Sequence, residues 1–395
     1  MGLVPIAFLS FLQDPFAWGS ATDKAADQAR REGKLVMLYF TSAGCGWSRK
    51  LERETFAEAR VNGALAKGFV GARVDVDAQS EIVARFKVHG TPHLVAATAD
   101  LDFVSQMIGF RDAEKLKAWI DRLQELYAKA RDIQAKLKAS PVDAGLHRQL
   151  GDHLRDLGNL PAAIAAYEAS AKISRERPNP AEEDRRFRGE TLVRLTDALR
   201  SENKAGPLAS LGEELCALDA DGKLGYRDNG LYVLALFEHH TALEEGQPER
   251  SKKALEHLRE AAAKYPDSDK GDEILLWLAV LCNDLEKDAA ESEKSLTRLI
   301  DKYPESPLAE FAKKALEKIR GGGAKDPAPA DPAKIEARSV VQDKYDRWRK
   351  KKAEVEAKGD LATGFDRTFV GVFEKDYLKA KEEFDAKWGE RFEPK

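Results

Sequence analysis

The sequence predicts an α/β domain followed by an all-α region and a C-terminal helical hairpin. Strand-like and helix-like segments alternate over the first third of the chain, and helical periodicity then runs almost unbroken from about residue 141 to 319. A Gly- and Pro-rich break separates this region from a strongly charged tail. The expected segments are an export-signal remnant or arm at 1–14, the α/β domain at 15–128, helical repeats at 129–320, a linker at 321–334 and a charged helical tail at 335–395.

Hydrophobic patterning predicts each element of the α/β domain. Residues 35–40 are consecutive apolar residues, which is typical of a strand buried on both faces. Asp112 precedes a stretch in which Leu116, Ile120 and Leu123 share one helical face, so we expect it to cap a long helix. The other predicted elements are helices at 19–32, from Cys45 to about Arg60 and at 80–86, and strands at 69–76, 93–97 and 103–108.

Cys45-Gly46-Trp47-Ser48 stands between the predicted strand at 35–40 and the helix that follows. Backbone N–H groups and the macrodipole at a helix N-terminus favour a thiolate, so Cys45 is a candidate nucleophile. The alternative is an inert cysteine packed as a small hydrophobe. Ser48 occupies the place of a second cysteine, and a hydroxyl cannot resolve a mixed disulfide. The motif therefore indicates single-thiol exchange, isomerisation or capture, or else a site that keeps only its fold.

These segments, together with Gly90-Thr91-Pro92, resemble the thioredoxin superfamily over about residues 15–128. The resemblance implies that Pro92 is cis and faces Cys45, and that Thr91 and Pro92 hold an extended client peptide. An ordinary loop proline before an edge strand is the alternative. Trp47 is expected either to form an apolar lip beside Cys45 or to pack against Leu51 one turn later.

Two positions depart from the family pattern. Thioredoxins carry a buried acidic residue six positions before the first cysteine, and this position is Tyr39 here. The aromatic residue that usually precedes that cysteine is Gly44. Both changes argue against ordinary dithiol activity.

The all-α region resembles tetratricopeptide repeats. The packing positions of one repeat are matched by Leu150, Gly151, Leu154, Ala163 and Tyr167. Residues 264–268 (Lys-Tyr-Pro-Asp-Ser) recur as residues 302–306 (Lys-Tyr-Pro-Glu-Ser), a period of 38 residues (302 − 264). A superhelix of stacked repeats is predicted, and a helical bundle without a concave groove is the alternative.

Composition excludes several classes of function. A net charge of −4 does not favour nucleic acid. Three cysteines, Cys45, Cys216 and Cys282, do not form a disulfide framework, and seven scattered histidines predict no metal site. We expect no cofactor and no transmembrane segment, and protein clients or an assembly partner as the binding partners.

Both ends of the chain leave alternatives open. Residues 2–12 are mostly apolar, which favours a periplasmic or otherwise exported protein, whereas a first strand or arm would suit a cytoplasmic one. In the tail, an aromatic stripe at Phe365, Phe369 and Phe373 predicts either a hairpin that folds back on the repeats or a docking helix for a partner.

The sequence thus supports two functional hypotheses. In the first, Cys45 attacks disulfides or captures client cysteines, Thr91 and Pro92 hold the client strand, and the repeats select the client. In the second, the protein is a redox-silent scaffold that uses both domains only for protein–protein interaction.

Overall fold

The computed structural model describes residues 16–202 and 204–320, together with seven isolated positions in the tail. The predicted N-terminal arm at 1–14 and the linker at 321–334 lie outside the described residues. The same is true of the predicted helical hairpin in the tail, apart from those isolated positions. The fold is therefore described for the α/β domain and the helical region.

The chain divides into two compact units. Of the described residues, 16–41, 47–202 and 204–320 belong to the first unit, and residues 42–46 and the described tail positions belong to the second. In the second unit, the rings of Tyr345 and Tyr377 have centroids 5.3 Å apart. One turn after Tyr377, Lys381 forms an ion pair with Asp385.

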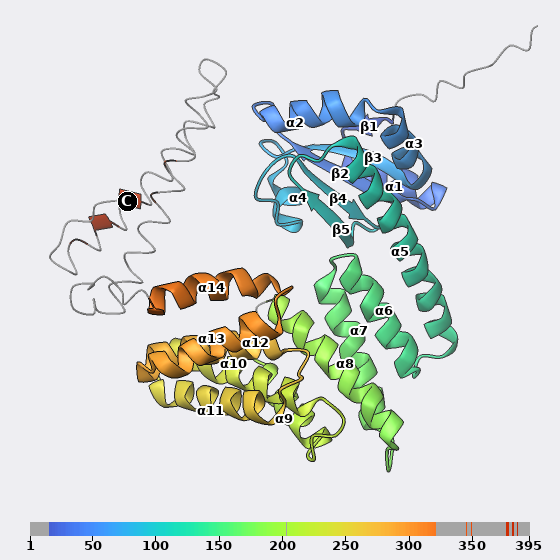
Figure 1. Ribbon diagram of the computed structural model, residues 1–395. Coiled ribbons are helices and arrows are strands. Elements are labelled where there is room, and N and C mark those ends of the chain that lie inside the picture. Colours follow the sequence, from blue (N-terminus) through green and yellow to red (C-terminus); the bar gives the residue numbers. More distant parts are fainter. Residues whose placement is uncertain are drawn as a thin grey trace, which may run out of the picture. The chain divides into compact units, whose positions relative to one another are not determined.

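Five strands form one mixed sheet in the order β1-β3-β2-β4-β5 (Figure 1). β1, β3 and β2 are parallel, whereas β4 runs antiparallel to β2 and β5 antiparallel to β4. All seven residues of the central strand β2 are buried, which accounts for its unbroken apolar sequence. The strands span Trp18–Gly19 (β1), Leu35–Thr41 (β2), Phe69–Asp75 (β3), His93–Ala97 (β4) and Phe103–Ile108 (β5).

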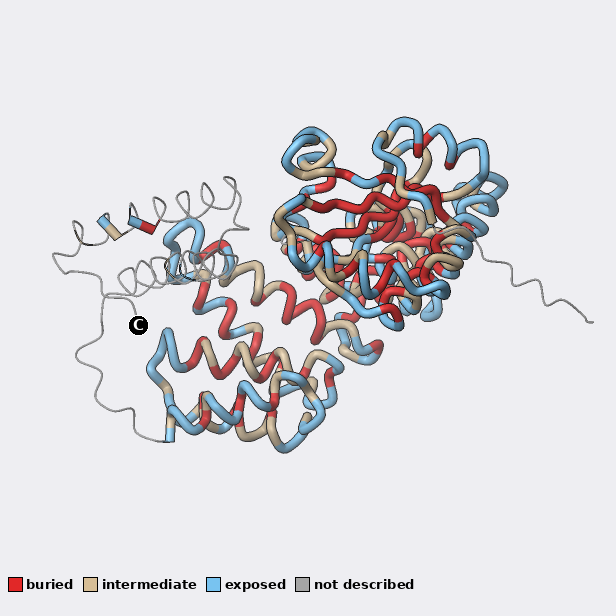
Figure 2. Tube along the Cα trace, turned by 90° about the horizontal axis from the view of Figure 1, so that it is seen from above, coloured by how far each residue is buried: buried red, intermediate tan, exposed pale blue. Residues whose placement is uncertain are grey.

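Helices cover both faces of this sheet, and the strands form its buried interior (Figure 2). Side chains alternate between the faces along β2. Met37 and Tyr39 lie in the core that α3 and α5 complete, whereas Leu38 and Phe40 lie in the core that α1 completes. The helices of the domain are α1 (Thr22–Glu32), α2 (Gly46–Lys50), η1 (Leu51–Phe56), α3 (Ala59–Gly68), α4 (Ser80–Arg85) and α5 (Ala113–Ala139).

The predicted single helix from Cys45 to about Arg60 is divided in the structure. α2 continues into the π-helix η1, and α3 follows as a separate helix. The break occurs because Glu58 has an extended backbone, with φ −71° and ψ 122°. Strand β1 was not predicted, because two residues are too short for periodicity to reveal.

Helix α5 belongs to both the α/β domain and the helical region. Leu116 and Ile120, in its first half, are buried in the sheet core, and Asp112 caps its N-terminus by accepting the Lys115 N–H at 2.9 Å. Ala130 and Ile133, in its second half, are buried against α6 and α7. The predicted domain boundary between residues 128 and 129 therefore falls inside one continuous helix.

The helical region contains nine α-helices among the described residues, and each packs against the next along the chain. Small residues allow close approach within it. A Cβ atom at Gly151 on α6 would lie 2.5 Å from Cε1 of Tyr167 on α7, so only glycine fits there. The helices are α6 (Ala144–Asp156), α7 (Leu160–Arg175), α8 (Glu182–Ser201), α9 (Leu208–Leu218), α10 (Arg227–Glu245), α11 (Pro248–Lys264), α12 (Gly271–Leu281), η2 (Cys282–Glu286, a π-helix), α13 (Ala289–Lys302) and α14 (Pro307–Arg320).

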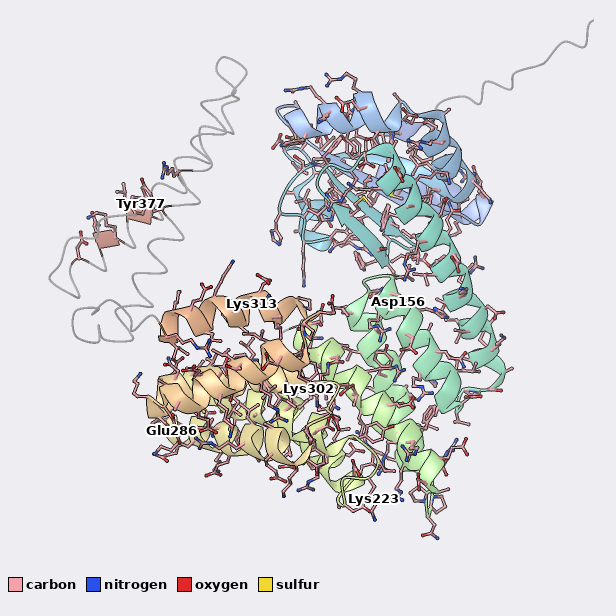
Figure 3. All side chains as sticks on the ribbon, in the orientation of Figure 1. Asp156, Lys223, Glu286, Lys302, Lys313 and Tyr377 are labelled. Atoms are coloured by element: carbon pink, nitrogen blue, oxygen red, sulfur yellow. The ribbon has the colours of Figure 1, made fainter. Side chains whose placement is uncertain are left out.

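The recurring Lys-Tyr-Pro motif has a structural explanation. Lys302, at the end of α13 (Figure 3), reaches back to the earlier copy and donates to the Pro266 carbonyl and Asp267, each at 2.5 Å. Tyr303 donates from its hydroxyl to the Ser268 carbonyl at 3.2 Å. The second copy of the motif thus forms hydrogen bonds to the loop between α11 and α12, and this loop contains residues of the first copy.

Candidate functional site

Cys45 lies in the short loop between β2 and α2, directly before the helix begins. Its side chain is half-buried, and its backbone N–H donates to the Ser42 carbonyl at 3.1 Å. It forms no disulfide with another described residue. Ser48, which stands where a second cysteine would be, is on α2 and is 1% exposed. Cys45 is therefore the one thiol at this junction, and Ser48 is buried beneath the surface of the helix.

Tyr39, on strand β2, forms a hydrogen bond with the backbone of the motif. The residue is 1% exposed, and its hydroxyl shares its one hydrogen between Oε1 of Glu52, at 3.0 Å, and the Ser48 carbonyl, at 3.3 Å. Nη2 of Arg73 lies 2.9 Å from the same oxygen of Glu52. Burial raises the pKa of Tyr39 to about 12, so its phenol stays protonated and acts as a donor at neutral pH.

Thr91 and Pro92 lie at the end of the sheet from which the loop to Cys45 departs. The peptide bond between them is cis, Pro92 is buried and Thr91 is half-buried. The next residue, His93, pairs with Phe40 at the end of β2. Strand register thus places Thr91 and Pro92 beside the end of β2.

The segment after β5 reaches the same end of the sheet. The Gly109 N–H donates to the Pro92 carbonyl at 2.8 Å. Ile108, which pairs with His93, is 56% exposed. The start of β4 and the end of β5 therefore form one continuous surface at this end.

Trp47 is 59% exposed, and its ring centroid lies 5.8 Å from that of Phe110. The Lys50 ammonium lies 5.4 Å from the Trp47 centroid and 4.7 Å from the Phe110 centroid, within the range of cation–π contacts. Trp47 is thus an exposed ring in contact with Phe110 and Lys50, and its role as an apolar lip beside Cys45 stays a prediction.

His93 is buried beside Pro92. Its Nε2 lies 3.0 Å from Oε1 of Gln106, and it is 2% exposed. Burial lowers the pKa of His93, so the imidazole is neutral at neutral pH and adds no charge to this end of the sheet.

The other two cysteines have different surroundings. Cys216, on α9, is half-buried, and Cys282, at the start of η2, is fully buried. Burial raises the pKa of the Cys216 thiol to about 11 and that of Cys282 to about 12. Neither forms a disulfide among the described residues, and their raised pKa values disfavour the reactive thiolate.

Over residues 16–202 and 204–320, no group of three His, Cys, Asp or Glu side chains is arranged to hold a metal ion. No helix in the described part of the chain is both long and apolar enough to cross a membrane.

Sequence reasoning assigned Cys45, Trp47, Ser48, Thr91 and Pro92 to the site. In the structure, Cys45 lies in the loop before α2, Trp47 and Ser48 lie on α2, and Thr91 and Pro92 directly precede β4. Their joint role stays a prediction. The sequence-based prediction missed the ion pair between Glu52 and Arg73. The available signal was weak: Arg73 is the exposed residue inside the otherwise buried strand β3, and its pairing with Glu52 depends on the parallel register that sets Tyr39 beside Arg73.

Comparison with known proteins identifies the α/β domain. Residues 22–124 match a family described as thioredoxin-like domain. A thioredoxin from Thermus thermophilus, solved in solution, is 26% identical over 29% of this chain and 89% of its own, with a TM-score of 0.26. A structure of a DsbH oxidoreductase is 21% identical over 24% of this chain and 76% of its own, with a TM-score of 0.22.

No curated protein sequence matches the chain. The family match runs from α1 into α5 and includes strands β2 to β5, whereas β1 and the helices after α5 fall outside it. The chain therefore carries a thioredoxin-like domain at its N-terminal end, followed by a helix-rich region.

Proposed function

We propose that this protein acts in thiol–disulfide exchange or client capture through a single cysteine, Cys45, and that its helical region selects the partner. The observation that carries the proposal is the position of Cys45. It lies between β2 and α2 of a thioredoxin-like domain, at the end of the sheet where Pro92 precedes β4. In that family this junction carries the attacking thiol.

The proposed chemistry follows from the single cysteine of the motif. The Cys45 thiolate attacks one sulfur of a client disulfide, and the electron pair of the broken S–S bond leaves on the other client sulfur. The product is a mixed disulfide between Cys45 and the client. Ser48 cannot resolve it, so a second, external thiol must attack and release Cys45 as a thiolate. Capture is therefore longer-lived than in a dithiol protein.

Thr91, Pro92 and Trp47 are the proposed client-binding residues. Thr91 and Pro92 border the loop that carries Cys45, where an extended peptide can pair with backbone groups. The exposed Trp47 ring offers an apolar contact on the helix side. Together they support a client strand held between α2 and the start of β4.

The helical region supports the partner-selecting role. Its consecutive helices, the Gly151–Tyr167 contact and the recurring Lys-Tyr-Pro motif fit tetratricopeptide-like repeats at 129–320, after a thioredoxin-like domain at 15–128. The apolar residues 2–12 favour an exported, periplasmic location.

A redox-silent scaffold is the second candidate, and Ser48 and Tyr39 are the observations that favour it. Both replace groups that dithiol catalysis uses in thioredoxins. In a scaffold, Cys45 is incidental and both domains only present binding surfaces.

Reaction with oxidised glutathione separates the two candidates. In a Cys216→Ala/Cys282→Ala protein, intact-mass spectrometry should show one glutathione per chain, and adding Cys45→Ala should abolish it. Reduced glutathione should then release the adduct. A Cys45 that stays unmodified under conditions where a small-molecule thiol reacts would leave the scaffold as the function.

Restoring the second thiol gives an independent measurement. Ser48→Cys should gain insulin-reduction activity with dithiothreitol as reductant, whereas Ser48→Cys combined with Cys45→Ala should have none. A Ser48→Cys protein without activity would show that the changes at Tyr39 and Gly44 prevent dithiol chemistry.

A further inference from the structure

A pocket in the helical region lies where α10 begins, beside the loop that joins α11 to α12. Its volume is about 390 Å³, and it is lined by Gly225, by Asp228 in the first turn of α10, and by residues 264–269. Three of the lining side chains are carboxylates, those of Asp228, Asp267 and Asp269. The pocket is therefore acidic, and it is far in sequence from the thiol motif.

Asp228 is the buried carboxylate of this pocket. The residue is 4% exposed and stands second in α10, where the helix N-terminus favours a negative charge. Its Oδ1 lies 3.4 Å from Nδ2 of Asn229. Its Oδ2 has no hydrogen-bond partner, and the carboxylate has no ion pair, among residues 16–202 and 204–320. A buried carboxylate oxygen without a partner is unfavourable, which points to an occupant of the pocket that donates to it.

Asn229 links Asp228 to a second carboxylate. Its Nδ2 also lies 3.1 Å from Oδ1 of Asp269, an exposed loop residue that has no ion pair with a described residue. Two carboxylates that line the pocket therefore lie around one amide nitrogen. Asp267 differs, because Lys302 pairs with it at 2.5 Å. The negative charge left for an occupant is that of Asp228 and Asp269.

Lys264 also lines the pocket. Its ammonium pairs with Glu260 one turn earlier on α11, at 3.2 Å. This cation is thus already engaged outside the two carboxylates of Asp228 and Asp269.

The second copy of the Lys-Tyr-Pro motif shows the equivalent carboxylate with a partner. Asp272 stands second in α12, as Asp228 does in α10. The Ser306 hydroxyl donates to Oδ2 of Asp272 at 2.5 Å. Ser268, the equivalent serine of the first copy, accepts the Lys270 N–H at 3.0 Å and donates no hydrogen bond to Asp228. The partner that the second copy supplies from within the chain is therefore missing at Asp228.

We propose that this pocket binds the guanidinium of an arginine side chain on a partner protein. A guanidinium is a planar fork of five donors, and it is more weakly hydrated than an ammonium. It can donate to two neighbouring carboxylates at once, which suits the arrangement of Asp228 and Asp269. The inference rests on the proposed function, because it assigns the partner-selecting role of the helical region to recognition of a cationic side chain.

The test compares two small probes, N-acetyl-arginine methylamide and its citrulline analogue. Citrulline replaces the charged guanidinium by a neutral urea of nearly the same shape. Saturation-transfer difference NMR with the full chain should detect the arginine probe, and the citrulline probe should bind about tenfold more weakly or not at all. The lysine probe should also bind more weakly than the arginine one, because an ammonium lacks the planar fork.

Three variants locate the binding. Asp228→Asn should weaken binding of the arginine probe by about tenfold, because it removes the buried charge. Asp269→Asn removes the exposed charge and should weaken it by about threefold. Asp272→Asn is the matched control, since it makes the same change at the same helix position in the copy that Ser306 completes, and it should leave the affinity unchanged.

Circular dichroism checks that each variant folds, and Asp269→Asn decides the question if Asp228→Asn does not fold. Equal signals from the arginine and citrulline probes would overturn the inference, as would undiminished binding in the Asp228 and Asp269 variants. Calcium chloride that abolishes the arginine signal, where sodium chloride of equal ionic strength does not, would identify a metal site and would also overturn it.

The two proposals fail separately, because the arginine probe does not involve Cys45. A protein that binds the arginine probe but takes up no glutathione loses the proposed thiol chemistry and keeps the pocket. A protein that takes up glutathione but binds both probes equally loses only the arginine site.

Discussion

Cys282, in the helical region, begins the π-helix η2, and Cys45, in the thioredoxin-like domain, precedes the α2–η1 segment. Both lie near basic side chains. The Sγ of Cys282 is 3.9 Å from Nη2 of Arg259, and Arg49 and Lys50 follow Cys45 within the first helical turns. Only Cys45 has basic residues close to it in sequence, because Arg259 precedes Cys282 by 23 residues.

The two thiols differ in their exposure to solvent, and the cation beside Cys282 is paired with carboxylates. Cys282 is 0% exposed, and Arg259 is already engaged by Glu286 and Glu291, each at 2.5 Å. Burial raises the pKa of the Cys282 thiol to about 12, and the adjacent Glu291 adds to the effect. Cys45 is half-buried. Arg259 therefore does not activate the Cys282 thiol, because no solvent reaches the sulfur and two glutamates neutralise the guanidinium.

The largest expected effect is the difference in alkylation rate between these two thiols. In the native protein at pH 7.5, iodoacetamide should modify Cys45 about 100-fold faster than Cys282, because only Cys45 is accessible. Peptide mass spectrometry of timed samples measures both rates in one protein. Denaturation should bring the two rates together, and comparable rates in the native state would contradict the comparison.

A smaller effect is expected from breaking the ion cluster around Cys282. Arg259→Gln should destabilise the protein by about 1 kcal/mol at pH 7, a value reduced by the partial exposure of the side chain. Chemical denaturation followed by circular dichroism measures this. Lys252→Gln on the same helix removes the partner of Glu249 in an exposed pair and should cost less than about 0.5 kcal/mol. Equal losses of stability in Arg259→Gln and Lys252→Gln would show that the partial burial of the cluster around Cys282 does not strengthen its ion pairs.

The same cluster predicts a pH dependence. The hydrogen bond from Arg259 holds the pKa of Glu291 below its usual 4.5. A depressed carboxyl pKa gives stability that is present above pH 4.5 and is lost as the pH falls through the folded-state value. Arg259→Gln should therefore flatten the loss of stability below pH 4.5. If the variant loses stability below pH 4.5 as steeply as the parent, the Arg259–Glu291 pair is not the cause of that loss.

The smallest effect is expected at Tyr39. Tyr39→Phe removes the hydroxyl that donates to Ser48 and Glu52 and should cost about 1 kcal/mol or less, since the ring remains packed. Tyr127→Phe, at a partly buried tyrosine of α5, is the matched control and should stay within about 0.5 kcal/mol of the parent. Denaturant midpoints compare the two. A larger loss in the control would reverse their expected order.

Local sequence predicted the regular elements of the fold well. The buried strand at 35–40, the N-cap at Asp112 and the helices after residue 141 all depend on short-range periodicity or capping. The helix break at Glu58 escaped notice because no proline or glycine marks it. β1 was missed because its only partner is β3, far along the chain.

The site was predicted only where a motif is contiguous. Cys45, Trp47 and Ser48 are neighbours in sequence, and family resemblance added Thr91 and Pro92. The contact of Glu52 with Arg73 depends on the register of β2 with β3 and on the π-helical turn of η1. Neither the register nor the π-helical turn can be predicted from a short stretch of sequence.

The shared helix α5 has a practical consequence for dissecting this molecule. A fragment that ends at residue 128 would cut α5 in its middle and also remove Leu157, which is buried in the core beneath the sheet. It would lose Asn159 as well, whose side-chain amide donates to the Phe103 carbonyl of β5 at 2.7 Å. The smallest fragment that keeps the sheet core whole therefore extends through α6 into α7, and redox properties measured on anything shorter would describe a domain with an incomplete core.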